Sequence, residues 1–517
     1  MAASKGDLNQ VEDAVLEKHV ESAPSLEQTY LEAGLSPDDA SFLADFSEER
    51  RKKCVRKVDW RLCPALTVVY LCAYIDRANI GNAKIEGLME ELNMSGSDYN
   101  IALCMFFIPY VLLEVPSNVL LSKFKKPSTY IGILTLGWGT VMTLTGVVQN
   151  FAGLVVTRFI LGVFEAGFFP GAILIVSRWY LPFETQTRLA LFYTASALAG
   201  AFSGLLAFAL AKMDGIGGYS GWRWIFLMEG LASVALGAAC FFFLVDSPSL
   251  SSGWLEPDEI RYLELRQQAY RGREVVDESG GKFDWKTLWS VITDWQLYLQ
   301  AINFWSNAVP NYGLKFTLPQ IIKNMGYTSA TAQLLTIPPY SVGAISAYVS
   351  ALLSDRFRWR LPSIVFGQTC VLVAFAILFS KAAEIKDNIP VCYFAVVLAC
   401  IGFYPILPAT NAWTVNNLAG TRKRTMGIAY MVCMGNTGGI IGSFIYKESE
   451  MPRYPTGFGN SFAFAGAGIV AAFTLEFFYK RINTSKDKLT SAEIHEKYTD
   501  EELQKMGDRS PLFKYSL

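Results

Sequence analysis

The stretch RLCPALTVVYLCAYIDRANIGNA, residues 61–83, is apolar over its first half and then carries charged and amide side chains. A helical run of this length crosses the roughly 30 Å hydrocarbon core of a membrane. Yet Asp76 and Arg77 stand inside it, followed by Asn79 and Asn82. An ionised side chain at mid-membrane costs at least about 2.5 kcal/mol, so these residues require a polar partner, a water-filled cavity or a function.

The rest of the chain repeats the apolar pattern. Of its 517 residues, 52% are hydrophobic and 18% are charged, which is too apolar for a soluble protein of this length. Backbone groups in lipid must be hydrogen-bonded within their own segment, so each apolar run is predicted to be a helix. The sequence predicts an all-α membrane protein with twelve transmembrane helices, at residues 60–80, 98–121, 129–148, 151–176, 188–211, 223–244, 295–318, 332–353, 361–380, 390–410, 425–446 and 461–482.

Basic residues gather beside alternate helices. They stand before the first helix and after the second, eighth and tenth, in EERRKKCVRK, KFKKP, DRFRWR and GTRKR. Basic loops stay in the cytoplasm, so both termini are predicted to be cytoplasmic, and the plasma membrane is the expected location. Asn93 then lies in the first outward loop, within an N-M-S sequon. It is a candidate glycosylation site, with a chance sequon as the alternative.

The helices fall into two sets of six. The predicted divisions are an N-terminal tail (1–57), a first half (58–245), a cytoplasmic linker (246–294), a second half (295–482) and a C-terminal tail (483–517). The polar tails are expected to be mobile, and LEPDEIRYLELRQQAY in the linker predicts a surface helix. Helix five, with LFYTASALAGAFSGLLA, is similar to helix eleven, with IAYMVCMGNTGGIIGSF. Two related halves are typical of one secondary-transporter fold, in which substrate is handled where the halves meet.

Histidine and cysteine usage argues against an enzyme or a metal protein. Only His19 and His495 exist, both in the polar tails, which excludes a histidine-based triad or a His metal site in the membrane. The nine cysteines show no CxxC spacing and are interpreted as small packing residues. We therefore predict no enzymatic activity, no cofactor and no metal. The expected partners are a small solute and membrane lipid, without nucleic acid, and the expected state is a monomer.

Ionisable residues inside the helices are the candidates for function. In RFILGVFEAGFFPG of helix four, Arg158 and Glu165 lie on one stripe. In helix one, Arg77 points about 100° away from Asp76, so their adjacency does not by itself make a salt bridge. Arg77 is predicted to hold a substrate carboxylate, because a guanidinium binds carboxylates bidentately. Asp76 and Glu165 are predicted to bind and release protons. Alternatively, these charges pair between helices and fix packing.

The remaining candidates have two interpretations each. Arg158 contacts substrate or serves only the packing of helix four, and Glu114, in a proline-kinked stretch, fits either role. Lys315, near the outward end of helix seven, either snorkels towards water or contacts substrate. Aromatic and amide residues are expected to shape the pocket, and the candidates are Tyr193, Tyr312, Asn411, Asn416 and Asn436.

The motifs resemble the major facilitator superfamily, in its anion:cation symporter group and its fungal allantoate permease branch. The resemblance rests on YIDRANIGNA, EVPSN, RFILGVFEAGFFPG and NNLAGTRKR in this order, and it covers nearly all of residues 60–482. It implies a two-bundle fold and proton-coupled uptake of a small organic anion, such as a vitamin or a nitrogen-source acid. It also implies that Arg77 contacts the substrate carboxylate, that Arg158 is the helix-four arginine, and that Asp76 and Glu165 carry the protons.

Two positions bear on how far the resemblance extends. SDRFRWR is similar to the superfamily's cytoplasmic signature, which implies that Asp355 and Arg356 latch the inward-closed state, although Ser122 replaces the usual Asp of the first half. Lys315 stands where the branch usually has a small or apolar residue, which favours a more anionic ligand or a different one. The motifs do not select a substrate. Export of a metabolite, and nutrient sensing by a receptor on a transporter scaffold, stay open as alternatives.

Overall fold

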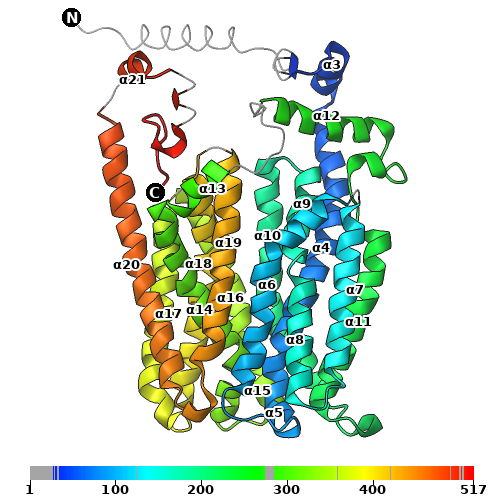
Figure 1. Ribbon diagram of the computed structural model, residues 1–517, viewed down its shortest axis with the longest axis vertical. Helices are drawn as coiled ribbons and strands as arrows, with labels where there is room; N and C mark the ends of the chain where they lie inside the picture. The colour runs from blue at the N-terminus through cyan, green and yellow to red at the C-terminus, as the bar shows by residue number, and fades with distance from the viewer. Residues whose placement is uncertain are drawn as a thin grey trace, which may run out of the picture. The chain divides into compact units, whose positions relative to one another are not determined.

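A computed structural model describes residues 27, 30, 31, 34–124, 126–273, 285–357, 359–419, 421–488, 491–499, 502, 503 and 506–517 (Figure 1). Every regular element in these ranges is a helix. The α-helices are α3 (Pro37–Asp45), α4 (Glu48–Ile85), α5 (Leu88–Glu91), α6 (Asp98–Ser122), α7 (Pro127–Thr145), α8 (Phe151–Glu165), α9 (Phe168–Trp179), α10 (Pro182–Ala211), α11 (Gly221–Phe243), α12 (Pro257–Arg273), α13 (Trp285–Ile292), α14 (Trp295–Asn324), α15 (Ser329–Leu334), α16 (Ile337–Phe357), α17 (Leu361–Lys381), α18 (Ile389–Asn416), α19 (Thr421–Ile445), α20 (Pro455–Lys486) and α21 (Ser491–Lys497). Five short 3₁₀ turns connect them, at Ile216–Gly218, Pro248–Leu250, Ala382–Glu384, Glu448–Glu450 and Gly507–Arg509.

Each of the twelve predicted helices corresponds to helical residues of the structure, which confirms the all-α membrane fold. Eight helical segments of the described chain are both long and apolar enough to cross a membrane, with α8 and α9 counted as one. The other four predicted spans are α7, α10, α14 and α16. Several helices are longer than predicted: α4 begins at Glu48, α14 continues to Asn324, α18 continues to Asn416 and α20 continues to Lys486.

Helix four of the prediction is interrupted once. It forms α8 up to Glu165 and resumes as α9 at Phe168. Pro170, in the first turn of α9, has no N–H to donate to the carbonyl four residues earlier, at Ala166. The break therefore lies directly after Glu165, so this carboxylate ends a helix inside the membrane segment.

The described residues form two compact units. The larger comprises residues 65–173, 188–244 and 283–517 and holds most of the transmembrane helices. In its first half, α7 packs against α8 and α11, and α6 packs against α8. In its second half, α17 packs against α18 and α20, α14 against α19 and α20, and α16 against α18 (Figure 1). A buried aromatic cluster that includes Phe375, Phe403 and Phe458 forms the core of the second half.

Glycines bring the two halves into contact. On α10, a Cβ added at Gly200 would stand 2.8 Å from ring atoms of Tyr340 on α16. On α19, a Cβ added at Gly439 would stand 2.3 Å from the ring of Phe107 on α6. The similar glycine-rich runs of helices five and eleven therefore serve equivalent crossings, each against the opposite half, where a missing side chain lets the helices approach closely.

Replacing Gly439 with alanine is expected to destabilise the protein by about 1–3 kcal/mol, the usual cost of overpacking a filled core. Phe107 is fully buried, so its ring has no free space to move into. Gly466→Ala is the matched control, because a Cβ there would be 3.7 Å from its nearest neighbour, in ordinary contact with Leu372. Thermal unfolding of the two purified variants measures the change in stability that each substitution causes. Equal melting temperatures for the two variants would contradict this account of the crossing.

The smaller unit comprises residues 1–64, 174–187 and 245–282, of which the described part contains α3 and α12. Helix α12 confirms the surface helix predicted in the linker. Phe46 stacks on Tyr262 of α12, with ring centroids 4.4 Å apart. Lys57 Nζ and Glu259 Oε1 form an ion pair at 2.6 Å. The residues from about 34 onward are therefore packed against the linker. Most of the earlier residues lie outside the described part of the structure, so a mobile N-terminal tail stays a prediction.

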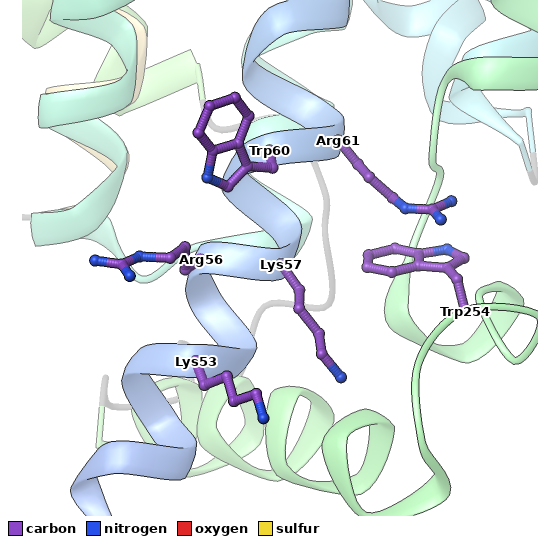
Figure 2. Close-up of a pocket in the computed structure, with 6 residues that line it drawn as sticks. All are labelled: Lys53, Arg56, Lys57, Trp60, Arg61 and Trp254. Atoms are coloured by element: carbon purple, nitrogen blue, oxygen red, sulfur yellow. The ribbon is translucent and has the colours of Figure 1, made fainter.

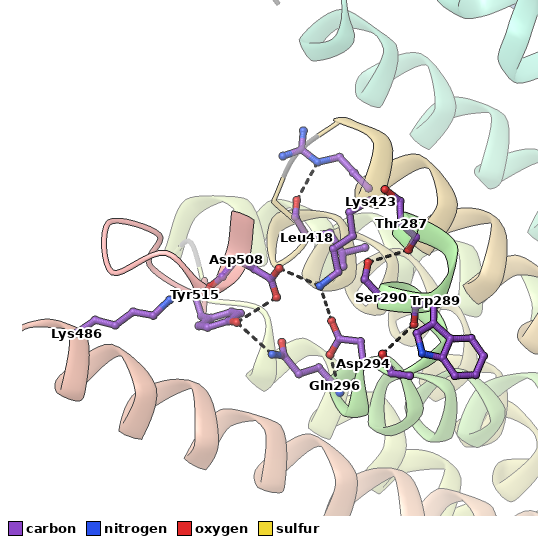
Figure 3. A network of polar contacts seen from close by, with 12 residues as sticks. Thr287, Trp289, Ser290, Asp294, Gln296, Leu418, Lys423, Lys486, Asp508 and Tyr515 are labelled. Atoms are coloured by element: carbon purple, nitrogen blue, oxygen red, sulfur yellow. Dashed lines mark hydrogen bonds and ion pairs between the residues drawn. The ribbon is translucent and has the colours of Figure 1, made fainter. Parts of the chain in front are cut away.

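The last described residues of the chain, 506–517, are also packed against helices. Trp413 of α18 donates a hydrogen bond from Nε1 to the Ser516 carbonyl at 2.9 Å. The Tyr515 ring stacks on Tyr479 of α20, with centroids 4.9 Å apart. Lys423, at the start of α19, pairs with both Asp294 and Asp508 (Figure 3). Residues 506–517 thus connect the ends of α14, α18, α19 and α20.

Candidate functional site

A buried ion pair joins helices one and four. Arg77 of α4 donates hydrogen bonds from Nε, at 3.0 Å, and from Nη2 to the same Glu165 oxygen, Oε1. The two side chains are 5% and 3% exposed. Glu165 is the last residue of α8, so the pair lies directly beside the break in helix four. Arg77 thus holds a carboxylate, the kind of group that the sequence predicted as its ligand, but supplied here by the protein itself.

Aromatic rings surround the Arg77 guanidinium. Its carbon lies 5.1 Å from the ring centroid of Tyr74, 4.8 Å from that of Phe106 and 4.9 Å from that of Tyr110. Ring faces attract cations and exclude water, which strengthens the charge interactions made inside the cage. A group that replaces Glu165 is therefore expected to be an anion, since the cage leaves the guanidinium charge without water.

The second half contributes another cation to the same place. Lys315 of α14 lies with Nζ 4.4 Å from the centroid of Tyr74, the ring that Arg77 also contacts. One turn earlier on α14, Tyr312 makes an edge contact with Phe107 of α6, with centroids 5.0 Å apart. Lys315 Nζ therefore reaches a ring of the first half, and its contact with substrate stays a prediction.

Asp76 lies in a separate polar cluster. Its carboxylate accepts a hydrogen bond from Ser233 Oγ of α11 at 2.6 Å. Asn79, one turn further along α4, donates to Glu229 of α11 and accepts from Ser203 of α10 at 3.1 Å. Asp76 and Arg77 thus face different neighbours, as the helical spacing indicated. Both Asp76 and Glu229 are buried, so each is costly to hold as an anion without a cation beside it.

Arg158 is a buried cation with spare hydrogen-bonding capacity. Its side chain is on α8, and the residue is 2% exposed. Its guanidinium carbon lies 5.5 Å from the ring centroid of Phe226 on α11. Within the described residues, Nε and Nη2 have no hydrogen-bond partner. Arg158 can therefore donate further hydrogen bonds from these two nitrogens to an anionic or carbonyl group.

The other residues predicted from the sequence differ in where the structure places them. Asn436 of α19 donates a hydrogen bond to Glu114 of α6 at 3.2 Å and so bridges the halves. Asn411 is half-buried on α18, whereas Asn416 is exposed at the end of that helix, where the structure does not bring it to Arg77. Arg356 and Asn93 are exposed. The side chains of Tyr193, Asp355 and Ser122 lie outside the described part of the structure.

Two buried contacts were missed from the sequence. Glu229 was visible as an acid within the apolar run of α11, and that position was the available signal. Lys84, at the end of α4, pairs with Glu448 between α19 and α20, and the lysine side chain is 6% exposed. No local pattern predicts this pair, because 364 residues separate its members.

The end of the bundle around Lys84 is closed by contacts between the halves. Tyr99 donates a hydrogen bond to the Phe316 carbonyl at 3.0 Å, and Asn100 donates to the Tyr446 carbonyl at 2.9 Å. Lys323 donates to the Ile85 carbonyl at 2.8 Å. These contacts and the Lys84 pair cover the Arg77 cage from this end.

Among the described residues, no group of three or more His, Cys, Asp or Glu is arranged to hold a metal ion.

Comparisons with known proteins agree with this architecture. The chain is similar to the transporter cnsO of Penicillium expansum, 39% identical over 481 residues that cover 91% of this chain and 92% of that protein. It is 29% identical to the high-affinity nicotinic acid transporter of Saccharomyces cerevisiae, over 91% of this chain and 85% of that protein. Its fold is similar to an inward-facing bacterial homolog of the lysosomal transporter Spinster, with a TM-score of 0.61, 17% identity, and coverage of 81% of this chain and 96% of that one.

The family model of the Major Facilitator Superfamily matches residues 66–443, which contain the Arg77 cage, nine of the predicted helices in full and most of two others. A two-half helical bundle with buried charges where the halves meet is the architecture of a membrane transporter of this class. The chain therefore belongs to the Major Facilitator Superfamily and is a multi-pass membrane transporter.

Proposed function

We propose that the protein is a proton-coupled symporter that takes up a small organic anion bearing a carboxylate, in the anion:cation symporter group and its allantoate permease branch. The observation that carries the proposal is the buried pair of Arg77 and Glu165 within an aromatic cage. A carboxylate already occupies the guanidinium, so a substrate carboxylate and Glu165 compete for one binding position. The proton decides this competition, because protonated Glu165 is neutral and binds a cation weakly.

The transport cycle follows from this competition. A proton from the outer side adds to Glu165, and the freed Arg77 then binds the substrate carboxylate. The halves rock so that the site opens inwards. Loss of the proton to the cytoplasm restores the Glu165 anion, which displaces the substrate from Arg77. Asp76 is the second proposed proton carrier, and Arg158, with two unpaired nitrogens, is a proposed substrate contact.

The orientation belongs to the same proposal. Both termini lie in the cytoplasm of a plasma-membrane protein, so the end closed by Lys84 and Glu448 faces outwards. Asn93 is exposed after α5, next to this end, which leaves it accessible to glycosylation. Loss of a glycosidase-sensitive mobility shift in Asn93→Gln tests this position. Reaction of an impermeant label with the C-terminus of intact cells would contradict the orientation.

Transport assays test the function. Uptake of labelled carboxylates, including nicotinate because of the relative that carries its name, is measured in cells without their own permeases, at outer pH 5 and pH 8. We expect faster uptake at pH 5 and loss of accumulation with a protonophore. Accumulation that is insensitive to pH and protonophore would overturn proton coupling. Lower cellular content of a labelled acid on expression would indicate export instead, and binding without any flux would indicate a receptor.

Lys315 is expected to set the charge of the preferred substrate. Arg77 and Lys315 contact the same ring, so a ligand with two anionic groups can neutralise both. Lys315→Met is expected to weaken competition by dicarboxylates about tenfold or more relative to monocarboxylates, since a buried charge pair is lost. Lys386→Met, at an exposed lysine outside the bundle, is the control. If Lys315→Met weakened competition by dicarboxylates and by monocarboxylates equally, Lys315 would be assigned a role in packing only.

A further inference from the structure

The segment before the first membrane run is strongly basic, with seven Lys or Arg residues between positions 50 and 61. Four of these are engaged by the protein itself, as ion pairs or as hydrogen bonds to backbone carbonyls: Arg50, Arg51, Lys52 and Lys57. The other three, Lys53, Arg56 and Arg61, are exposed and have no carboxylate partner in the part of the chain that the structure describes. Their positive charge is therefore available to an external anion.

These three cations lie on one face of α4. Together with Lys57 and Trp60 they follow the spacing i, i+3, i+4, i+7 and i+8, which places side chains along a single stripe of a helix. The stripe is about 12 Å long at 1.5 Å per residue. With Trp254 from the linker, the five residues line a pocket of ≈ 450 Å³ (Figure 2). In Figure 2 the Arg61 guanidinium lies over the Trp254 ring, 4.7 Å from its centroid.

The pocket stands where the polar segment meets the apolar one. Trp60 is 76% exposed, and the apolar run of α4 begins within the next turn of the same helix. Exposed tryptophan beside a membrane segment is typical of the headgroup region, where an amphipathic ring contacts both lipid and water. A soluble anion would not need Trp60, whereas a lipid places its headgroup and its apolar part at the same boundary.

We propose that this pocket binds the phosphate headgroup of an anionic phospholipid. Arg61, beside the Trp254 ring, presents a planar donor that matches phosphate oxygens. Lys53 and Arg56, which leaves α4 on the other side of the stripe, add positive charge around it (Figure 2). Basic clusters directly beside a membrane helix attract anionic lipids, by about fivefold in affinity per residue. This site is separate from the Arg77 cage and does not depend on which substrate is transported or in which direction.

Binding is measured with the full-length protein in detergent, by fluorescence anisotropy of a labelled short-chain phosphatidylinositol phosphate. We expect the triple variant Lys53→Gln/Arg56→Gln/Arg61→Gln to bind about 100-fold more weakly. Lys52→Gln, whose lysine is paired with Glu48 on the same helix, is the matched control and is expected to bind as the native protein does. Thermal unfolding checks that the triple variant is folded. If the triple variant does not fold, the three single variants provide the test, and each is expected to bind the lipid about fivefold more weakly than the native protein.

The outcomes separate the possible ligands. Phosphatidylcholine with the same chains is expected not to compete, and inorganic phosphate is expected not to displace the probe at equal concentration. Displacement by inorganic phosphate as effective as by the lipid would show a site for free anions and overturn the proposal. Equal losses in Lys52→Gln and the triple variant would also overturn it, because binding would then follow overall charge and not this pocket.

Discussion

Replacing Arg77 with alanine is expected to reduce uptake about thirtyfold or more. The substitution removes the guanidinium that we assign to the substrate carboxylate, and losing one member of a buried charged contact costs about 2–5 kcal/mol of binding, where 1.4 kcal/mol is tenfold. The measurement is the initial rate of proton-driven uptake at outer pH 5, normalised to protein in the membrane. Arg77→Lys keeps the charge but loses the planar fork, so we expect a large but smaller loss.

Stability and binding are separable at this pair. Arg77→Ala leaves Glu165 buried without its cation, which is expected to cost about 3–5 kcal/mol of stability. In the double variant Arg77→Ala/Glu165→Gln the unpaired charge is gone, so the melting temperature should recover. Uptake should not recover, because no guanidinium remains. Recovery of both would show that the pair serves packing only.

Glu165→Gln alone distinguishes coupling from binding. This variant retains Arg77 and resembles the protonated state of Glu165, so substrate exchange across the membrane is expected to continue. Uphill uptake is expected to be lost, because the glutamine amide cannot release a proton. Normal uphill transport by both Glu165→Gln and Asp76→Asn would refute the assignment of coupling protons to these residues.

Replacing Lys423 with methionine is expected to destabilise the second half by about 3–5 kcal/mol, the usual cost of breaking a buried ion pair. Lys423 Nζ lies 2.7 Å from Asp294 and 2.9 Å from Asp508, and all three side chains are mostly buried. Without the lysine, two carboxylates remain close together with no cation. Thermal or denaturant unfolding of the purified protein measures the loss, with α14, α19 and the C-terminal segment released together.

Controls at Lys423 use the same chain. Lys447→Met removes an exposed lysine whose pair with Glu450 is 3.8 Å long, and no measurable change is expected there. Burial lowers the pKa of Lys423, but the hydrogen bonds to Asp294 and Asp508 outweigh this effect and raise it above the ordinary value. The stabilisation is therefore complete below the lysine pKa of the unfolded chain and decreases only at more alkaline pH. A Lys423→Met effect that changes between pH 6 and pH 8 would contradict this cause.

Much of the fold could be predicted because lipid imposes local rules. Each apolar run had to be a helix, so the helix positions followed from composition alone. The faces of Asp76 and Arg77 also followed, because helical geometry separates adjacent residues by about 100°. The break after Glu165 was not predicted, although Pro170 removes a backbone donor there. The structure shows that Glu165, the last residue before this break, is the partner of Arg77.

The partners of the charged residues could not be read from the sequence. Glu165 lies 88 residues from Arg77, Glu448 lies 364 residues from Lys84, and Asp508 lies 85 residues from Lys423. Composition also suggested mobile tails, since neither tail contains an apolar run. The described parts of both tails are packed because single aromatic side chains, such as Phe46 and Tyr515, stack on rings of distant helices. Such contacts depend on the three-dimensional shape of the packed helices, which a local sequence pattern does not predict.

The sequence by itself determined an all-helical membrane protein with two related halves and with charges that need partners. Hydrophobicity and helical period are local properties, and the membrane makes them decisive. Only the tertiary structure decided that Arg77 holds Glu165, that Lys315 reaches the same ring from the other half, and that Asp76 belongs to another cluster. These contacts depend on how separate helices pack together, because a buried charge takes the partner that packing brings within hydrogen-bonding distance.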